Sequence, residues 1–519
     1  MVRRLTGLAV LVALLCATAA GIAAAAGGSR PRLLAPCAYG TSVPYLRGYE
    51  RRAVVRDAWR YADHLTGVSH AQRTSDARYF AAAAAAYVYG LSLVDVHETV
   101  KRFEVRNQIT SVDALQNPSD ETTVSPNVDT AYTVGWIDLL TSGPVVISVP
   151  NTGGRFYTIQ LMDAYSNSFS YIGSGSTGTK AGNFAILPPG WSGTLPAGVK
   201  PIKSPTNTVW LLGRTLLKGT ADEAKVKPIL EKIVATPLTA WELGVRGVAN
   251  VESSYPSQKP ISRPTGTSFI ATLNQEMTID PPRARDDCAV RALAPAGVVL
   301  PHPSHAQSLA ADYQNESGDP KGSTANTPQN KAVTAGTAKA IKLVATAAAK
   351  LDRAAGRAHR GWDVLGDWVG NYAKRYLGRA IIATDLLGAN TPRQAIYPLD
   401  YRDLEGRRLS GAHDYTLTFP KGKLPPVRAF WSLTMYLPDN YLYANSVDRY
   451  EVGSHTTGLV YNPNGSLTIY IQHREPAQGK RRANWLPAPA HGFHLILRLY
   501  RPRPSVFDGR WSIPPVVRR

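Results

Sequence analysis

The chain of 519 residues is too long for one hydrophobic core and predicts two or three domains. Charged residues make up only 18%, and the 43 glycines and 38 prolines indicate many turns and much β structure. The net charge of +20 is spread along the chain, without a basic stripe interleaved with stacking aromatic residues. This pattern argues against a nucleic-acid-binding protein and predicts attraction to an anionic cell envelope.

The N-terminus has the pattern of an export signal. Basic Arg3 and Arg4 precede an apolar run from Leu8 to Ile22, and Ala24 to Ala26 offer a small-residue cleavage site. Residues 1–26 are therefore predicted to be a signal peptide, followed by an N-terminal extension over 27–75. An uncleaved membrane anchor is the rival interpretation, because the apolar segment approaches the length of a membrane span.

Two cysteines, Cys37 and Cys288, remain after the predicted leader. An oxidising compartment permits a disulfide between them, but their distance in the sequence says nothing about geometry. Two separate, unreactive thiols are the favoured expectation.

Helical and strand patterns alternate along the first 389 residues. Residues 76–105 contain no proline and carry apolar residues at helical spacing, which predicts a long helix. From Val124, short runs of β-branched and aromatic residues predict strands, and residues 143–150 and 155–163 flank an Asn-Thr-Gly-Gly turn as a hairpin would. Further expected elements are a strand at 208–217, a helix from Ala221, a helix at 269–277, a solvated linker at 317–330 and helical chain over 331–389.

The last 120 residues carry a clear strand signal. Apolar residues recur at every second position in four segments: Tyr415, Leu417, Phe419; Trp431, Leu433, Met435, Leu437; Leu467, Ile469, Ile471; and Leu495, Leu497, Leu499. The alternate positions are polar but weakly charged: Thr416, Thr418, Ser432, Thr434, Tyr436, Thr468, Tyr470, Gln472, His494, Arg498 and Tyr500. This spacing predicts an antiparallel sandwich or barrel with one face of each strand inside.

The sequence contains no common catalytic motif in the structural context that the motif requires. Gly173 to Gly178 match the dinucleotide spacing G-x-G-x-x-G, but Gly and Pro-Pro-Gly follow where a helix should begin, and no acidic residue occurs up to Lys218. No metal-ligand spacing and no G-x-S-x-G nucleophile motif occur either, so no metal and no cofactor are expected. Asp129, Asp138 and Asp163 remain as carboxylates that could pair for hydrolysis.

Two groups of segments resemble a known pair of domains. Residues 125–139 (SPNVDTAYTVGWIDL) and 153–178 (GGRFYTIQLMDAYSNSFSYIGSGSTG) resemble the domain DUF1254. Residues 429–453, 465–476, 484–502 and 511–515 resemble its usual companion, DUF1214. The resemblance implies an immunoglobulin-like β-sandwich within residues 76–251, an α-helical segment with a flexible linker over 252–389, and a jelly-roll-like β-sandwich over 390–519.

The resemblance also marks candidate site residues, although it implies exported proteins of unsettled function. Asp129 and Asp163 are expected to transfer protons, and the expected substrate-binding residues are Asn127, Tyr132, Arg155, Tyr157, Gln160, Tyr436, Tyr470, Trp485 and Arg498. Asn, Asp, Tyr and Arg suit acid–base chemistry and the orientation of a polar ligand. An ideal strand would separate Arg155 and Asp163 by roughly 26 Å, so their convergence would require a bend.

We therefore expect an exported cell-envelope protein, secreted or peripherally associated with the envelope. One hypothesis is a hydrolase that acts on a glycan or a small polar molecule. The alternative is a non-catalytic protein that binds a glycan, a lipid or a partner chain, and a homo-oligomer is compatible with both. Neither hypothesis involves nucleic acid.

Overall fold

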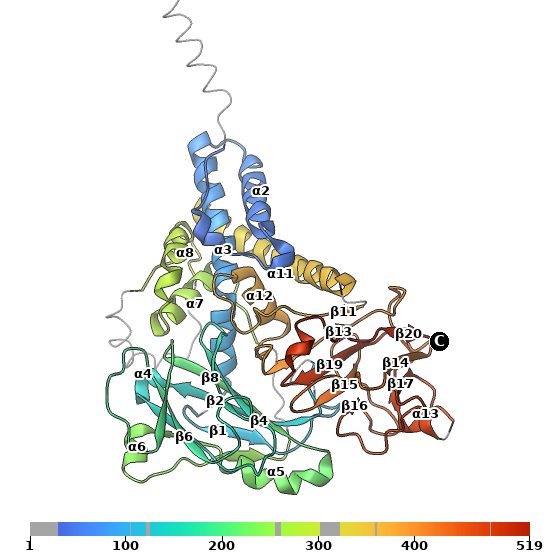
Figure 1. The fold of residues 1–519 in the computed structure, drawn as a ribbon. Coiled ribbons are helices and arrows are strands. Elements are labelled where there is room, and N and C mark those ends of the chain that lie inside the picture. The colour runs from blue at the N-terminus through green and yellow to red at the C-terminus, as the bar shows by residue number, and fades with distance from the viewer. Residues whose placement is uncertain are drawn as a thin grey trace, which may run out of the picture.

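The computed structural model describes residues 30–103, 105–120, 125–254, 261–301, 322–358, 361–477 and 479–519. A helical unit stands above two β-rich halves that lie side by side, the N-terminal half on the left of Figure 1 and the C-terminal half on the right. The predicted signal peptide and the first part of the predicted 317–330 linker lie outside the described residues. The chain is thus multidomain, with several β-sheets and a substantial helical part.

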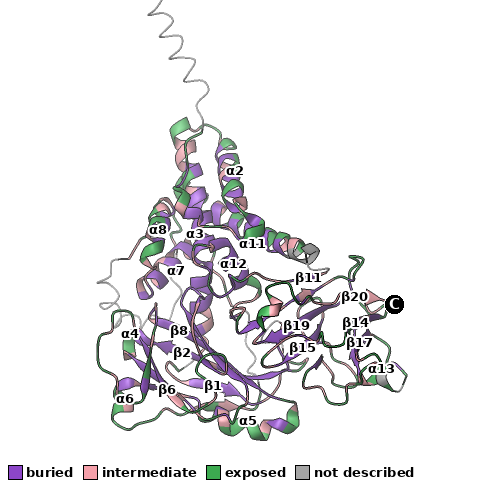
Figure 2. Cartoon of the chain, in the orientation of Figure 1, coloured by how far each residue is buried: buried purple, intermediate pink, exposed green. Residues whose placement is uncertain are grey.

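A long buried helix, α3 (His70–Val100), forms the axis of the helical unit. Ser69 caps its N-terminus by accepting a hydrogen bond from the Gln72 amide, so the predicted helix begins six residues before residue 76. This helix is long and apolar enough to cross a membrane, but 94% of its most apolar stretch is buried inside the protein. Figure 2 shows it as buried along its lower length, which is the pattern of a core helix.

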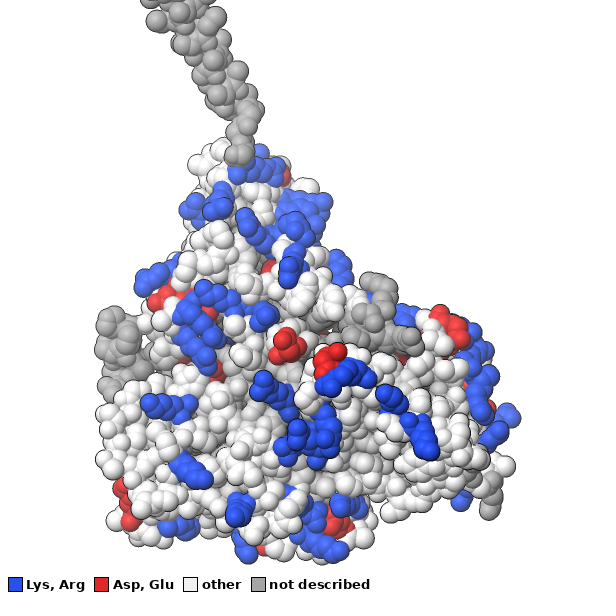
Figure 3. Space-filling model, in the orientation of Figure 1, with Lys and Arg blue, Asp and Glu red and all other residues white. Residues whose placement is uncertain are grey.

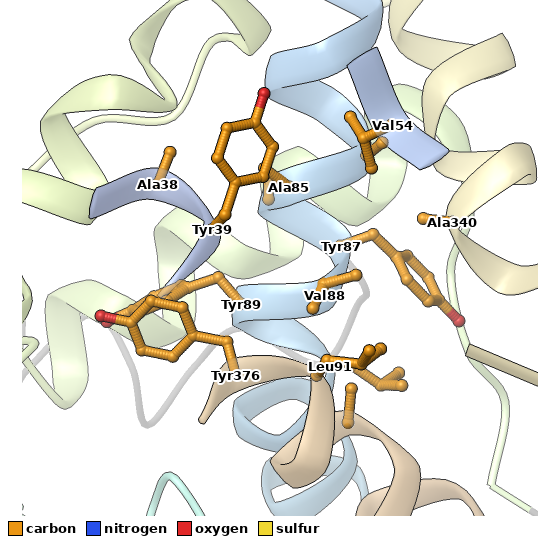
Figure 4. Close-up of a cluster of buried hydrophobic side chains, with 14 of the residues drawn as sticks. Ala38, Tyr39, Val54, Ala85, Tyr87, Val88, Tyr89, Leu91, Ala340 and Tyr376 are labelled. Atoms are coloured by element: carbon orange, nitrogen blue, oxygen red, sulfur yellow. The ribbon is translucent and has the colours of Figure 1, made fainter. Parts of the chain in front are cut away.

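Among the described residues, five further helices surround α3 and share its core. They are α2 (Tyr49–Asp63), α7 (Gly266–Ile279), α8 (Asp287–Ala292), α11 (Pro328–Ala358) and α12 (Tyr376–Asp385). Figure 4 shows part of this core, where Tyr89 of α3 meets Tyr376 of α12 edge to face, with ring centres 5.1 Å apart. Small alanines on α3 let its neighbours approach closely.

The expectation of two unpaired cysteines is wrong, because Cys37 and Cys288 form a disulfide. It joins a short 3-10 helix, η1 (Pro36–Tyr39), to α8. Leu33, Leu34 and Ala38 pack in the same core as Ala289 and Val290. Burial of these apolar side chains brings together two segments that are distant in the sequence.

Two sheets pack face to face in the N-terminal half around a shared apolar core. The first has the order β10-β1-β2-β8-β4-β5 and the second the order β7-β6-β3-β9. Their strands are β1 (Ile109–Val112), β2 (Thr130–Asp138), β3 (Val145–Val149), β4 (Tyr157–Asp163), β5 (Ser168–Gly173), β6 (Gly182–Leu187), β7 (Val199–Lys203), β8 (Thr208–Leu216), β9 (Val234–Pro237) and β10 (Asn250–Glu252). The smaller helices of this half are α4 (Leu139–Ser142), α5 (Glu223–Leu230) and α6 (Leu238–Glu242).

The predicted hairpin between residues 143–150 and 155–163 is wrong, because the two strands lie in different sheets. β3 pairs with β6 and β9, whereas β4 pairs with β8 and β5. The Asn151–Gly154 turn carries the chain from one sheet to the other. The turn sequence would be the same in a hairpin and in a connection between two sheets. Which of the two forms depends on the distant strands with which β3 and β4 pair.

Two predicted helices are shorter than expected. The helix expected from Ala221 covers only Glu223–Leu230, and the following chain forms β9 against β3. The chain expected to be helical over 331–389 forms α11 and α12, with β11 (Trp362–Asp363) between them. Trp362 is fully buried in the C-terminal core, which removes this stretch from the helical unit.

The C-terminal half also consists of two sheets around one core. The first has the order β11-β13-β19-β15-β16 with β12 also paired to β19, and the second has the order β18-β17-β14-β20. The strands are β12 (Ala395–Ile396), β13 (Leu399–Asp400), β14 (Tyr415–Phe419), β15 (Trp431–Tyr436), β16 (Glu451–Gly453), β17 (Leu467–Gln472), β18 (Trp485–Pro487), β19 (His494–Tyr500) and β20 (Val516–Arg518), and α13 (Lys480–Ala483) precedes β18. The apolar residues predicted by alternation enter this core from β14, β15, β17 and β19, with the exception of Leu437.

Candidate functional site

The two β halves meet on the polar face of a C-terminal sheet. Strands β15 and β19 pair antiparallel, and Ser432 opposes Arg498 while Tyr436 opposes His494. Because alternate side chains of these strands fill the C-terminal core, these four point to the other face of the sheet. All four are nevertheless buried, since the N-terminal half covers that face.

The segment Ser125–Asp129 of the N-terminal half docks on this polar face. Arg498 donates from Nη2 to the Ser125 carbonyl at 2.8 Å, and the Tyr436 hydroxyl donates to the Pro126 carbonyl. The Ser432 hydroxyl donates to Asp129 Oδ2 at 2.6 Å. Segments that resemble DUF1254 and DUF1214 thus contact each other where the two halves meet.

Asn127 holds Asp129 in position. Its Oδ1 accepts hydrogen bonds from the Asp129 and Thr130 amides at 3.0 and 2.9 Å, a local turn of the kind that Asn favours. Its Nδ2 donates to the Tyr132 hydroxyl at 2.7 Å. The three residues therefore form one hydrogen-bonded unit at the start of β2.

Glu451 faces Asp129 from the C-terminal half. It lies on β16 opposite Thr434, on the same polar face, and its carboxyl is close enough to the Asp129 carboxyl for each to affect the charge of the other. Burial, followed by the nearby Asp129 charge, raises the pKa of Glu451 well above its usual range. Glu451 therefore keeps its proton to a higher pH than a free carboxyl does.

Three buried polar atoms in and around this carboxyl pair have no hydrogen-bond partner among the described residues. They are Oε2 of Glu451, Nε2 of His455 and the Tyr500 hydroxyl. Burial, with a smaller effect of Lys218, lowers the pKa of His455, so its imidazole is neutral. A donor and an acceptor are thus left free beside a protonated carboxyl, as a bound polar molecule would require.

Two buried guanidinium groups belong to the surrounding polar network. Burial opposes the charge of Arg498, but Tyr436, Tyr500 and Asp129 raise its pKa and keep it a cation. Arg214 of β8 donates to Gln160 Oε1 at 3.2 Å and lies 5.4 Å from the centre of the Tyr132 ring. Gln160 and Tyr132 are therefore joined to the same network through Arg214.

The structure thus brings together six of the predicted residues and separates the others. Asn127, Asp129, Tyr132, Gln160, Tyr436 and Arg498 belong to the network between the halves. Arg155 lies near the same end of the N-terminal sheet, where it forms a bidentate ion pair with Asp222. Tyr157 is buried in the core between the two N-terminal sheets.

Asp163 lies far from Asp129. Asp163 is opposite Val209 at one end of β8, whereas the Asp129 carbonyl accepts a bond from the Leu217 amide beyond the other end. Eight residues of extended chain correspond to roughly 27 Å. Both Asp163 oxygens accept hydrogen bonds, from the amides of Asn167 and Tyr165 and from Arg283 at 2.7 Å. The contacts of this carboxylate are therefore those of a residue that stabilises the fold.

Tyr470 and Trp485 lie in the other C-terminal sheet, paired on β17 and β18. Trp485 lines a surface groove of about 430 Å³ together with Tyr443, Asn445, Ser446, His473 and Pro487. The groove does not include the carboxyl pair. Trp485 Nε1 and the Asn445 side chain are already hydrogen-bonded to backbone groups. The groove therefore has fewer polar atoms without a hydrogen-bond partner than the contact between the halves.

Sequence reasoning missed Glu451, His455 and Arg214. The available signal for Glu451 was its position next to the polar strand faces, in a segment that resembles DUF1214. What the sequence could not show is that this face is covered by the N-terminal half. Within the described ranges, no group of three His, Cys, Asp or Glu side chains is placed to hold a metal ion.

Fold and site define a protein of two β domains and a helical unit, with a polar network where the β domains meet. Residues 106–237 match DUF1254 and residues 394–504 match DUF1214, both described as proteins of unknown function. The chain belongs to the two-domain family that combines them.

Two solved structures are similar to this chain. The VPA0106 protein from Vibrio parahaemolyticus aligns with a TM-score of 0.58 and 24% identity, covering 85% of this chain and 100% of that one. An uncharacterised protein from Burkholderia cenocepacia aligns with a TM-score of 0.38 and 10% identity, covering 92% and 97%. A search of curated proteins found no match. The first likeness supports the fold alone, and the second is too weak to support an argument.

Proposed function

We propose that this protein is an exported hydrolase whose reaction centre is the Asp129–Glu451 carboxyl pair. The observation that carries the proposal is the proximity of these two carboxyls across the domain boundary, with unsatisfied polar atoms on Glu451 itself, His455 and Tyr500. Asp129 accepts the Ser432 hydroxyl and suits the role of general base toward water. Glu451 holds the proton that a leaving group would take.

The carboxyl pair also favours one substrate class. A carboxyl that keeps its proton beside a second carboxyl resembles the dyads that activate a water molecule for attack on a carbonyl group. We therefore favour a small polar molecule with a hydrolysable acyl bond as the substrate.

Export is part of the proposal and has two supports. The first 26 residues have the composition of a signal peptide, and Cys37 and Cys288 are paired, as is usual in oxidising compartments. The two-sheet packing of each β half is consistent with the immunoglobulin-like and jelly-roll-like folds that the family resemblance implies.

Substitution of the two carboxyls tests the proposal. Asp129→Asn and Glu451→Gln keep the side-chain shape, and each is expected to lower hydrolysis of amide or ester substrates about 10²- to 10⁴-fold. The matched control is Glu475→Gln, which removes a half-exposed carboxylate whose partner is Arg482. Unchanged turnover in both site variants, with melting temperatures near that of the natural protein, would contradict the assignment.

A non-catalytic binding role is the second candidate, and the surface groove favours it. Tyr443 and Trp485 give the groove aromatic walls beside Ser446, a combination suited to stacking against a sugar. Tyr443→Ala should then weaken glycan binding without changing any turnover at the carboxyl pair. Loss of glycan binding in Glu451→Gln but not in Tyr443→Ala would argue against the groove.

A further inference from the structure

The helical unit bears an unusual set of cations. Residues 30–80 contain nine arginines and no lysine, against four acidic residues. Three of the four acids, Glu50, Asp57 and Asp76, are buried. The exposed charge of this unit is therefore strongly positive, and Figure 3 shows blue side chains distributed over its surface.

Three of these arginines form a stripe on α2. Arg52, Arg56 and Arg60 are four residues apart, so they lie along one face of the helix, and all three are exposed. Val54, Ala58 and other residues of the opposite face are buried in the helical core. The stripe is thus presented to the solvent by a firmly packed helix.

Helix stability does not account for the stripe. Like charges four residues apart on a helix destabilise it by a few tenths of a kcal/mol per pair. Asp57 offsets part of this repulsion, with Arg56 at 3.0 Å and Arg60 at 3.8 Å, but it also pairs with Lys339 at 3.2 Å. An arrangement that costs stability and exposes guanidinium groups is better explained by an external anion.

The stripe lies at the end of the molecule where the N-terminal leader joins. Arg30 pairs with Asp63 at 2.8 Å, and Asp63 is the last residue of α2. Figure 1 accordingly shows the described chain beginning beside the upper end of α2. The apolar run Leu8–Ile22 precedes this point, so a bilayer that takes up the run would lie beside the arginines.

We propose that the stripe Arg52, Arg56 and Arg60 docks this protein on a membrane surface rich in anionic phospholipid headgroups. The partner chemistry follows from the residue type, because the planar guanidinium group binds phosphate through two parallel hydrogen bonds and lysine does not. Both β domains lie at the other end of the molecule from the start of the described chain. This inference does not depend on the carboxyl pair or its chemistry.

Vesicle binding of the full chain tests the proposal. Binding is measured for phosphatidylcholine vesicles and for mixed phosphatidylcholine–phosphatidylglycerol vesicles, with the triple variant Arg52→Gln, Arg56→Gln, Arg60→Gln. Each arginine near an anionic surface contributes about fivefold in affinity, so the triple variant should bind the mixed vesicles roughly a hundredfold more weakly. Its binding to pure phosphatidylcholine should not change, because both proteins carry the same apolar leader.

The control variant combines Lys225→Gln with Lys232→Gln, which removes exposed cations in and just after α5, at the far end of the molecule. It should bind both vesicles as the natural protein does. An equal loss in the control, or no loss in the triple variant, would overturn the proposal in favour of net charge or of the leader alone. A loss seen with duplex DNA but not with the mixed vesicles would overturn it in favour of a nucleic-acid surface.

Discussion

At the residue scale, the best-defined charged cluster is buried between α3, α7 and the N-terminal sheet. His97 lies between Glu276, 2.6 Å from its Nδ1, and Asp280, 2.9 Å from its Nε2. Lys101 pairs with Glu276 at 2.9 Å, and Asp280 also accepts the Thr208 amide. His97, Glu276 and Asp280 are fully buried, and Lys101, which also pairs with Glu98 at 3.1 Å, links them to the surface.

This cluster predicts a pH dependence of stability. Burial alone would lower the pKa of His97, but Glu276 and Asp280 outweigh it and raise the pKa to about 9. Because the folded pKa lies above the unfolded value near 6.5, the contribution is complete below pH 6.5 and is lost as the pH rises through about 9. Its size is on the order of 3 kcal/mol.

The free energy of unfolding, measured in denaturant across this pH range, checks the prediction. His97→Gln should be less stable at pH 6 and should lose most of the decline toward high pH. The exposed His70→Gln should keep the decline of the natural protein. The same slope in the natural protein and in His97→Gln would show that other groups cause it.

At the element scale, close helix packing depends on glycine. Gly336 of α11 faces α3, and a Cβ atom at this position would lie 2.4 Å from the Phe80 carbonyl oxygen. Gly90 of α3 is also tight, but there the nearest atom is Leu273 Cδ1 at 2.6 Å, the end of a flexible side chain. Backbone cannot move aside as a side chain can.

We therefore predict different outcomes for two equivalent substitutions. Gly336→Ala should lower the free energy of unfolding by about 1 to 3 kcal/mol despite the better helix propensity of alanine. Gly90→Ala should change it by less, because Leu273 can adopt another rotamer. Denaturant midpoints of the two variants give the comparison, and a Gly90→Ala loss equal to or larger than that of Gly336→Ala would contradict it.

Elements also differ in how far the sequence predicts them. Alternation placed Leu417, Leu433, Ile469 and Leu497 in one core correctly, because a strand with one face in an apolar core must alternate. The hairpin at Asn151–Gly154 failed because a turn signal does not state which strands will pair. The helix over 331–389 failed at Trp362, whose burial in the C-terminal core outweighs local helix propensity.

At the scale of the whole molecule, the disulfide ties the N-terminal segment to the helical unit. It closes a loop of 251 residues, from Cys37 to Cys288. Removing a native disulfide costs about 2 to 5 kcal/mol, chiefly because the unfolded chain gains freedom. We expect Cys37→Ser combined with Cys288→Ser to lower the free energy of unfolding by this amount.

The control uses a reducing agent. Reductant should lower the stability of the natural protein to that of the double variant and leave the variant unchanged. If reductant lowers the stability of both proteins equally, the loss does not come from this disulfide.

The candidate site exists only at the scale of the whole molecule. Asp129 and Glu451 are separated by more than 300 residues and belong to different domains. Asp129 could be proposed from its place in a polar motif, whereas its partner was sought at Asp163, in the same domain. The structure instead pairs Asp163 with Arg283 and Asp129 with Glu451.

The sequence by itself determined the local and repetitive features of this protein. The core faces of the C-terminal strands, the long helix α3 and the resemblance to both domains follow from periodicity and motifs that neighbouring residues carry. The tertiary structure alone decided the disulfide, the separation of β3 from β4 and the proximity of the two carboxyls. Those features depend on which distant surfaces bury each other. An apolar stretch of sequence shows that its surface will be buried, but not which other segment will cover it.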